Sequence, residues 1–68
     1  MFRITIAEYV GETIENFFEH GHKYLIRVIR KCGGQYIIRE MLTGREYYYI
    51  DGGRVLSHWK IDKKYFKF

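Results

Sequence analysis

Three histidines, one cysteine and one serine are the residues of this 68-residue chain that are best suited to nucleophilic or metal chemistry. Ser57 precedes His58, but neighbouring residues of a strand point to opposite faces, so this histidine cannot act as a base for that hydroxyl. His20 and His22 lie one residue apart, and no further ligands follow at the short spacings typical of zinc sites. Cys32 has no second cysteine with which to form a redox pair. The sequence therefore predicts no catalytic residue, no metal site and no cofactor.

Carboxylates and glycines also occur in patterns that could do chemistry, but simpler structural roles account for them. Glu12, Glu15 and Glu19 recur at intervals of three and four residues, which is typical of the solvated face of a helix. The glycine pairs at 33–34 and 52–53 belong to neither GxGxxG nor GxxxxGK[ST], and hairpin turns explain them better. We therefore predict that the protein is not an enzyme.

A set of aromatic and basic residues remains, and it suits a binding surface. Aromatic rings stack on nucleobases and Lys and Arg neutralise phosphates, so a sheet face with both is typical of nucleic-acid binding. Tyr and Arg are also enriched in protein–protein hot spots. Structural roles compete with both interpretations, because Tyr favours strands and charged side chains protect sheet edges. The candidate binding residues are Arg27, Lys31, Tyr36, Arg45, Tyr47, Tyr49, Arg54, His58 and Lys60.

The composition predicts one small folded domain over residues 1–68. Hydrophobic residues make up 47% of the chain and aromatic residues 19%, which excludes an intrinsically disordered protein. A single cysteine excludes a small secreted scaffold held by intramolecular disulfides. The net charge of +4 is unevenly spread, with −3 on residues 1–22 and +7 on residues 23–68. This polarity bears on the charge of the partner rather than on the fold.

Targeting signals are not expected in this sequence. Residues 1–10 alternate between apolar and polar types, unlike the continuous apolar stretch of a signal peptide. No segment approaches the roughly 18 apolar residues that are needed to cross a bilayer. We therefore expect a cytoplasmic protein that has a free thiol and no membrane partner.

The hydropathy pattern predicts an α+β fold with an N-terminal strand, one short helix and a four-stranded antiparallel meander. Phe2, Ile4 and Ile6 alternate with polar or small residues and indicate the N-terminal strand. Apolar residues at helical spacing, followed by Gly21, place the helix near residues 12–20. Turn signals at residues 33–34, 43–44 and 52–53 then separate four β-rich segments: KYLIRVIRKC, QYIIREML, REYYYID and RVLSHWK.

Two-residue loops at these turns would fix the register of the meander, with Val28 opposite Arg39 and Ile37 opposite Ile50. This register exposes the face with the candidate binding residues and buries the other face beneath the helix residues Ile14, Phe17 and Phe18. A one-residue error in any loop would exchange the faces of every strand beyond it. The predicted core face holds Ile26, Val28, Ile37, Met41, Tyr48, Ile50, Val55 and Trp59.

Residues 60–68 form a basic and aromatic C-terminal segment. It could be a last strand that pairs with the N-terminal one and closes the sheet toward a small barrel, or a disordered tail. In length, meander and basic charge the chain resembles small SH3-like and OB-like barrels. This resemblance concerns the fold and implies no function.

Two hypotheses of function follow from the predicted surface. The first is a small non-enzymatic nucleic-acid-binding module, for DNA or RNA, that uses the aromatic and basic face of the sheet. The second is a small protein-interaction module that docks on a larger protein, such as a phage-type or mobile-element inhibitor of a host protein. A long sheet edge in so small a protein could also pair with a second copy and form a homodimer.

Overall fold

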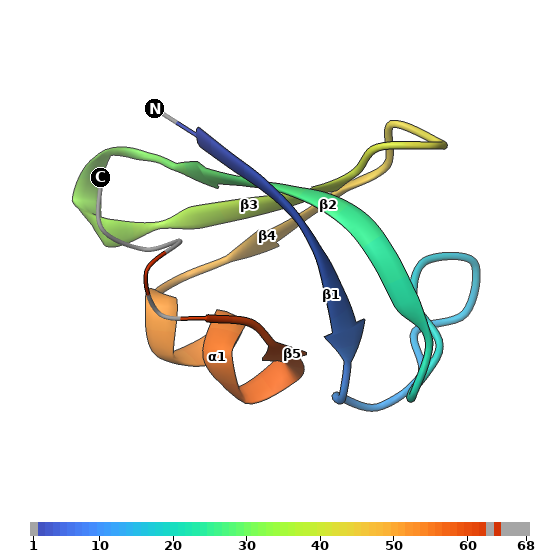
Figure 1. The fold of residues 1–68 in the computed structure, drawn as a ribbon. Helices are drawn as coiled ribbons and strands as arrows, with labels where there is room; N and C mark the ends of the chain where they lie inside the picture. Colours follow the sequence, from blue (N-terminus) through green and yellow to red (C-terminus); the bar gives the residue numbers. More distant parts are fainter. Residues whose placement is uncertain (1, 63, 65–68) are drawn as a thin grey trace.

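The fold is given by a computed structural model, which describes residues 2–62 and 64. It is α+β: five antiparallel strands form one curled half-barrel sheet, and a short α-helix lies across its open side (Figure 1). The order of strands in the sheet is β4-β3-β2-β1-β5. Within the described residues, no helix is long and apolar enough to cross a membrane. The elements in chain order are β1 (Phe2–Tyr9), β2 (Lys23–Arg30), the 3-10 turn η1 (Cys32–Gly34), β3 (Tyr36–Glu40), β4 (Glu46–Tyr49), α1 (Gly52–His58) and β5 (Trp59–Lys60).

The predicted N-terminal strand is confirmed as β1, which pairs antiparallel with β2 along its length. The other edge of β1 pairs with the short strand β5, where Glu8 lies opposite Lys60 and Tyr9 opposite Trp59. The chain therefore returns to its N-terminal strand, as predicted, but through Trp59 and Lys60. Residues 63 and 65–68 of the predicted tail strand lie outside the described residues.

The predicted helix over residues 12–20 is wrong, because this segment belongs to the loop between β1 and β2, residues 10–22, which we call the β1–β2 loop. Ile14 and Phe18 form an isolated antiparallel bridge, with backbone hydrogen bonds of 2.7 Å from Ile14 N to Phe18 O and 3.0 Å from Phe18 N to Ile14 O. Asn16 lies between them with φ 69°, in the left-handed region. Residues four apart meet both in a helix and in this turn, so apolar spacing alone could not separate the two. A helix shorter than about 12–15 residues is also marginal in water without strong packing.

The predicted last strand begins instead as the helix α1. The side chain of Asp51 caps this helix, its Oδ1 accepting a hydrogen bond of 2.8 Å from the backbone N–H of Arg54. Aspartate is among the preferred N-cap residues because it satisfies one of the free N–H groups of the first turn. Asp-Gly-Gly was interpreted as a hairpin turn, and here the aspartate begins a helix. Val55 is buried beneath the sheet and anchors α1.

The register of the first hairpin differs from the predicted one by one residue, with Val28 opposite Ile38 rather than Arg39. The link contains three residues, Cys32–Gly34, between Lys31 and Gln35, and Lys31 N donates to Gln35 O at 2.7 Å. An odd link in place of an even one exchanges the faces of the strand that follows. The register of the second hairpin differs from the predicted one by two residues, with Ile37 opposite Tyr48. A shift of two residues does not change the face, so β4 keeps the exchange of faces that was made at the first hairpin.

The core consequently contains tyrosines that were predicted to be exposed. Tyr36 and Tyr49 are buried on the concave face, 9% and 5% exposed, together with Ile38. Tyr48 and Ile50, predicted to be core residues, are each 67% exposed. The core prediction is confirmed for five residues, which are all buried: Ile26, Val28, Ile37, Val55 and Trp59.

Aromatic rings fill the concave side of the sheet around Trp59. Phe18 of the β1–β2 loop packs edge-to-face on this indole, with ring centroids 4.8 Å apart, and Tyr9 does the same at 5.1 Å. The indole Nε1 of Trp59 donates a hydrogen bond of 3.1 Å to the hydroxyl of Tyr49. Phe18 is 1% exposed, whereas Phe17 is 38% exposed, so the loop contributes one ring to the core and leaves the other at the surface.

Candidate binding groove

Three hollows follow strand β4 in order along its length. The first is lined by Arg45, directly before β4, and by residues of the β1–β2 loop that include Ile14. The second lies between Tyr47, the same loop and the end of α1. The third is bordered by residues 47–50 and by Arg54 and His58 of α1. The first two share Ile14, and the last two share Tyr47 and His58, so the three hollows adjoin one another, and we call them together the β4 groove.

The third hollow lies against the edge of β4 rather than against one of its faces. Tyr47, Tyr48 and Tyr49 all line it, although successive side chains of a strand point to opposite faces. Consecutive residues of both faces can border one hollow where it lies along the edge of the strand. Among the described strands, β4 is the last of the sheet and pairs with β3 alone, so no described strand covers this edge, which we call open.

The hydrogen-bond pattern identifies the backbone groups at the open edge. Glu40 N donates to Arg45 O at 2.8 Å, which makes these residues a hydrogen-bonded pair of the β3–β4 ladder. Hydrogen-bonded and non-hydrogen-bonded pairs alternate along an antiparallel ladder. The backbone N–H and C=O groups of Tyr47 and Tyr49 therefore face β3, and those of Glu46 and Tyr48 face the open edge.

Aromatic rings at the two ends of the groove are in contact through Tyr47. The ring of Phe17 lies 5.7 Å from that of Tyr47 at an interplanar angle of 71°, and Tyr47 lies 5.3 Å from Tyr49. The guanidinium carbon of Arg45 is 6.0 Å from the centre of the Phe17 ring, a cation–π distance. Phe17 and Tyr47 keep part of their surface open to solvent, which a bound segment could cover.

His58 joins α1 to the end of β1 beside the groove. Its carbonyl oxygen accepts hydrogen bonds from Val10 N at 2.7 Å and from Gly11 N at 3.1 Å. Its ring packs edge-on against Tyr49, with centroids 5.5 Å apart. Ser57, its neighbour, also lines the second hollow, but the Ser57 hydroxyl donates to the carbonyl of Arg54 at 2.9 Å rather than to a histidine. Both residues line the groove because they lie on the helix α1, so the prediction that they point to opposite faces of a strand is wrong.

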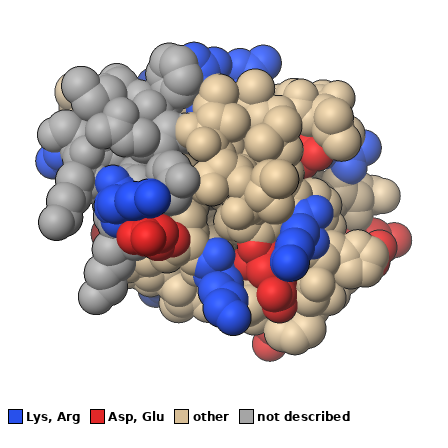
Figure 2. Space-filling view, viewed as in Figure 1, with Lys and Arg blue, Asp and Glu red and all other residues tan. Residues whose placement is uncertain are grey.

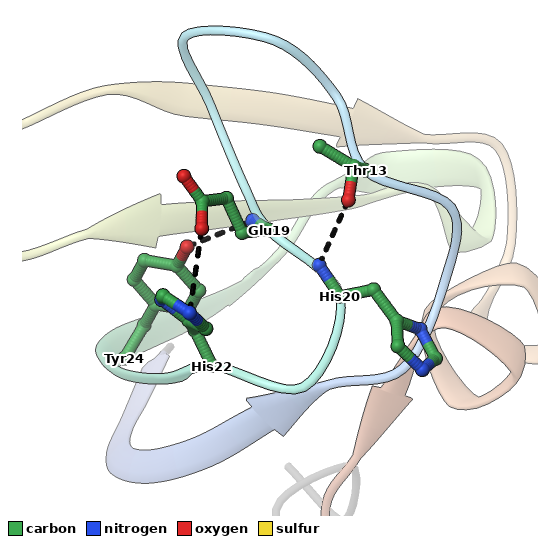
Figure 3. Close-up of polar contacts among 5 residues, drawn as sticks. All are labelled: Thr13, Glu19, His20, His22 and Tyr24. Atoms are coloured by element: carbon green, nitrogen blue, oxygen red, sulfur yellow. Dashed lines mark hydrogen bonds and ion pairs between the residues drawn. The ribbon is translucent and has the colours of Figure 1, made fainter.

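The β1–β2 loop forms one wall of the groove and is held by polar contacts within the loop and with Tyr24 of β2 (Figure 3). The backbone N–H of Glu19 donates to the hydroxyl of Tyr24 at 2.8 Å, and that of His20 donates to the hydroxyl of Thr13 at 3.1 Å. The carboxylate of Glu19 lies 3.3 Å from Nε2 of His22. These contacts fix the backbone that carries the carboxylates of the wall.

Five of the nine predicted binding residues line the groove, and four do not. Tyr36 is buried in the core and Arg27 lies opposite Arg39 on the outer face of the sheet. Lys31 and Lys60 are exposed elsewhere, at the end of β2 and on β5. Basic and acidic side chains are mixed on the face shown in Figure 2 instead of forming one basic surface. The five that meet at the groove are Arg45, Tyr47, Tyr49, Arg54 and His58.

The sequence interpretation missed Phe17, Tyr48 and the loop carboxylates as part of a site. Phe17 and Tyr48 were placed in the core, the first by the predicted helix and the second by the predicted register. A signal was present in Asp51, whose N-cap role would have placed Arg54 and His58 on one helix beside β4.

No protein-family model, no curated protein and no solved structure matches this chain.

In the described part of the chain, no three His, Cys, Asp or Glu side chains gather as a metal site, and the Cys32 thiol is exposed and free. Burial raises the pKa of Tyr49 to about 12, against a smaller opposing effect of the hydrogen bond from Trp59, so the phenol beside the groove is neutral near pH 7. The groove offers an open strand edge, aromatic rings and charges of both signs.

Proposed function

We propose that the protein is a small, non-enzymatic protein-interaction module that binds an extended segment of a larger protein in the β4 groove. The observation that supports this proposal most directly is the open edge of β4, which runs along the groove. In strand addition, main-chain hydrogen bonds supply affinity, and pockets for alternate side chains supply specificity. The backbone groups of Glu46 and Tyr48 are the pairing sites, and the hollows around Tyr47 receive side chains.

The dimensions of β4 suit a short segment. Its four residues, Glu46–Tyr49, span about 13 Å at roughly 3.3 Å per residue. An added strand would pair over about four residues and could extend at either end into the hollows at Arg45 and Arg54. An antiparallel direction continues the pattern of the sheet, in which every strand pair is antiparallel.

The charges of the groove support a protein partner over a phosphate backbone. Glu12, Glu15 and Glu19 line the groove from the β1–β2 loop, opposed by the basic residues Arg45 and Arg54. A nucleic-acid strand that followed β4 would bring its phosphates beside these carboxylates. The predicted stacking residues Tyr36 and Tyr49 are buried and cannot stack on bases.

Nucleic-acid binding stays a prediction, now limited to the groove. The contact of Arg45 with the half-exposed Phe17 favours it, because a base could stack on this ring while the guanidinium meets a phosphate. Its affinity would fall steeply with salt, whereas strand addition depends much less on salt.

Three finer proposals accompany this function. The curled sheet, with β5 returning to β1, supports a small SH3-like or OB-like barrel as its fold type. A compact binding module of this kind would suit a phage-type or mobile-element inhibitor of a host protein. The open edge of β4 would also be the site of a homodimer, in which the two β4 strands pair.

Selection from a phage-displayed library of random heptapeptides tests the function. We expect the protein to enrich peptides whose binding is lost in Tyr48→Pro, since proline removes the N–H that faces the open edge and breaks no bond of the β3–β4 ladder. Tyr48→Thr is the matched control, because it removes the ring and keeps that N–H. Amide exchange at residues 46 and 48 should slow when the peptide binds.

The proposal fails if no peptide is enriched, or if the enriched peptides bind Tyr48→Pro as well as they bind the parent protein. Peptides N-methylated at alternate residues repeat the test without a variant, in case Tyr48→Pro does not fold. Oligonucleotide binding in place of peptide binding would favour the alternative function. A sedimentation coefficient that rises with protein concentration, but not for Tyr48→Pro, would identify the homodimer.

A further inference from the structure

The two ends of the β4 groove differ in charge. At the start of β4, the first hollow is lined by Glu15 and Glu19 and by one basic residue, Arg45, and Glu12 lines the hollow next to it. At the end of β4, the third hollow has Arg54 and no acidic residue among its described lining residues. A segment in the groove therefore meets excess negative charge at one end and positive charge at the other.

The carboxylates of the loop are available to a ligand. Glu12 and Glu15 are exposed, and within the described chain neither is in an ion pair. Glu19 has His22 as its partner at 3.3 Å, and both side chains are more than 60% exposed. The Arg45 guanidinium lies near the ring of Phe17 and is not paired with any of these carboxylates in the described structure.

The backbone of this wall is ordered by the Ile14–Phe18 bridge and by the hydrogen bond from Glu19 N to the Tyr24 hydroxyl. The main chain that carries the carboxylates is therefore held in place before a ligand binds. Less conformational entropy is lost when a cationic side chain binds there. Phe17 and Tyr24 line the same hollow, and a Lys or Arg side chain could also lie against these rings.

We propose, on the basis of the proposed function, that the partner segment is basic at one end and that its direction is fixed. A Lys or Arg lies against the β1–β2 loop, beside Glu12 and Glu15. Because β4 runs from the loop end of the groove toward Arg54, an antiparallel segment has this basic residue on the C-terminal side of its paired residues. Its N-terminal side lies at Arg54, where an acidic or uncharged polar residue is preferred.

Substitutions that remove the negative charges of the loop measure the preference for a basic residue in the partner segment. An exposed ion pair contributes about 1.5- to 5-fold to affinity, so Glu12→Gln/Glu15→Gln should weaken binding of the best selected heptapeptide by about 3- to 20-fold. The loss should shrink as salt is raised. Glu8→Gln is the matched control, because Glu8 lies on β1 opposite Lys23 and Lys60 and lines none of the three hollows. It should leave affinity unchanged.

The selected peptides themselves report the direction. We expect Lys or Arg to be enriched toward their C-terminal end. A nitroxide on the peptide N-terminus should broaden the amide signals of Ile50 and Arg54 and spare those of Glu15 and Phe17. The converse broadening, or affinity unchanged in the double variant, would overturn the inference. Peptides without basic residues that still lose binding in Tyr48→Pro would overturn it and leave the proposed function standing. Insensitivity to Tyr48→Pro would overturn the function itself.

Discussion

Tyr49 shows how one side chain serves both the core and the groove. It is 5% exposed, accepts the indole hydrogen bond of Trp59 at 3.1 Å, and lines the third hollow. Its ring packs between Tyr47 and His58, two residues that a partner would touch. The sequence predicted Tyr49 as a binding residue, whereas its burial places its ring in the core, in contact with these neighbours.

Titration of this phenol should weaken the fold at alkaline pH. Burial raises the pKa of Tyr49 from 10 to about 12, so the unfolded chain loses this proton before the folded chain does. The stabilisation is complete below pH 10 and is lost as the pH rises toward 12. Urea denaturation between pH 9 and 12 should show this loss, and Tyr49→Phe should reduce it. A Tyr49→Phe variant with the same pH dependence as the parent would contradict the assignment.

Elements were predictable from the sequence where periodicity alone decides them. The alternation of apolar residues located β1, and turn signals between β-rich segments located β2 to β4 and their antiparallel pairing. The helix was missed because Asp-Gly-Gly serves equally as a hairpin turn and as a helix start. The candidate site was assembled from suitable residue types, but its face depended on the parity of the link Cys32–Gly34, which no local propensity determines.

The start of α1 depends on the cap at Asp51. Asp51→Ala removes the acceptor for Arg54 N and should destabilise the protein by about 0.5–2 kcal/mol, whereas Asp51→Asn retains an acceptor and should cost much less. Thermal unfolding of the three proteins measures the difference. Amide exchange in Gly52–His58 should also accelerate in the alanine variant, and equal stability of the two variants would show that the cap is dispensable.

The whole molecule combines a thin core with a loop that closes one end of it. Phe18 reaches from the β1–β2 loop to Tyr9, Tyr24 and Trp59, while its neighbour Phe17 faces the groove. The acidic first third of the chain and its basic remainder thus meet along β4. The uneven distribution of charge along the sequence thus becomes a difference in charge between the two ends of one groove. The structure was needed to show this arrangement.

The two phenylalanines should therefore separate stability from binding. Phe18→Ala empties a fully buried site and should cost about 3–5 kcal/mol, a large part of the stability of so small a protein. Phe17→Ala removes a ring that is 38% exposed and should retain the fold but weaken binding of the selected heptapeptides. Chemical denaturation and peptide titration measure the two effects. Similar losses of stability in both variants would contradict the division of roles.

The three-residue link between β2 and β3 also limits which insertions and deletions the chain can accept at this point. A pairing of β2 with β3 that was shifted by one residue would place Arg39 and Glu46 where Ile38 and Tyr47 now stand. A sheet with that pair of charges in place of core-packed side chains could not retain its packing. Insertions or deletions that shift this pairing by one residue should be among the most damaging changes that the protein can acquire.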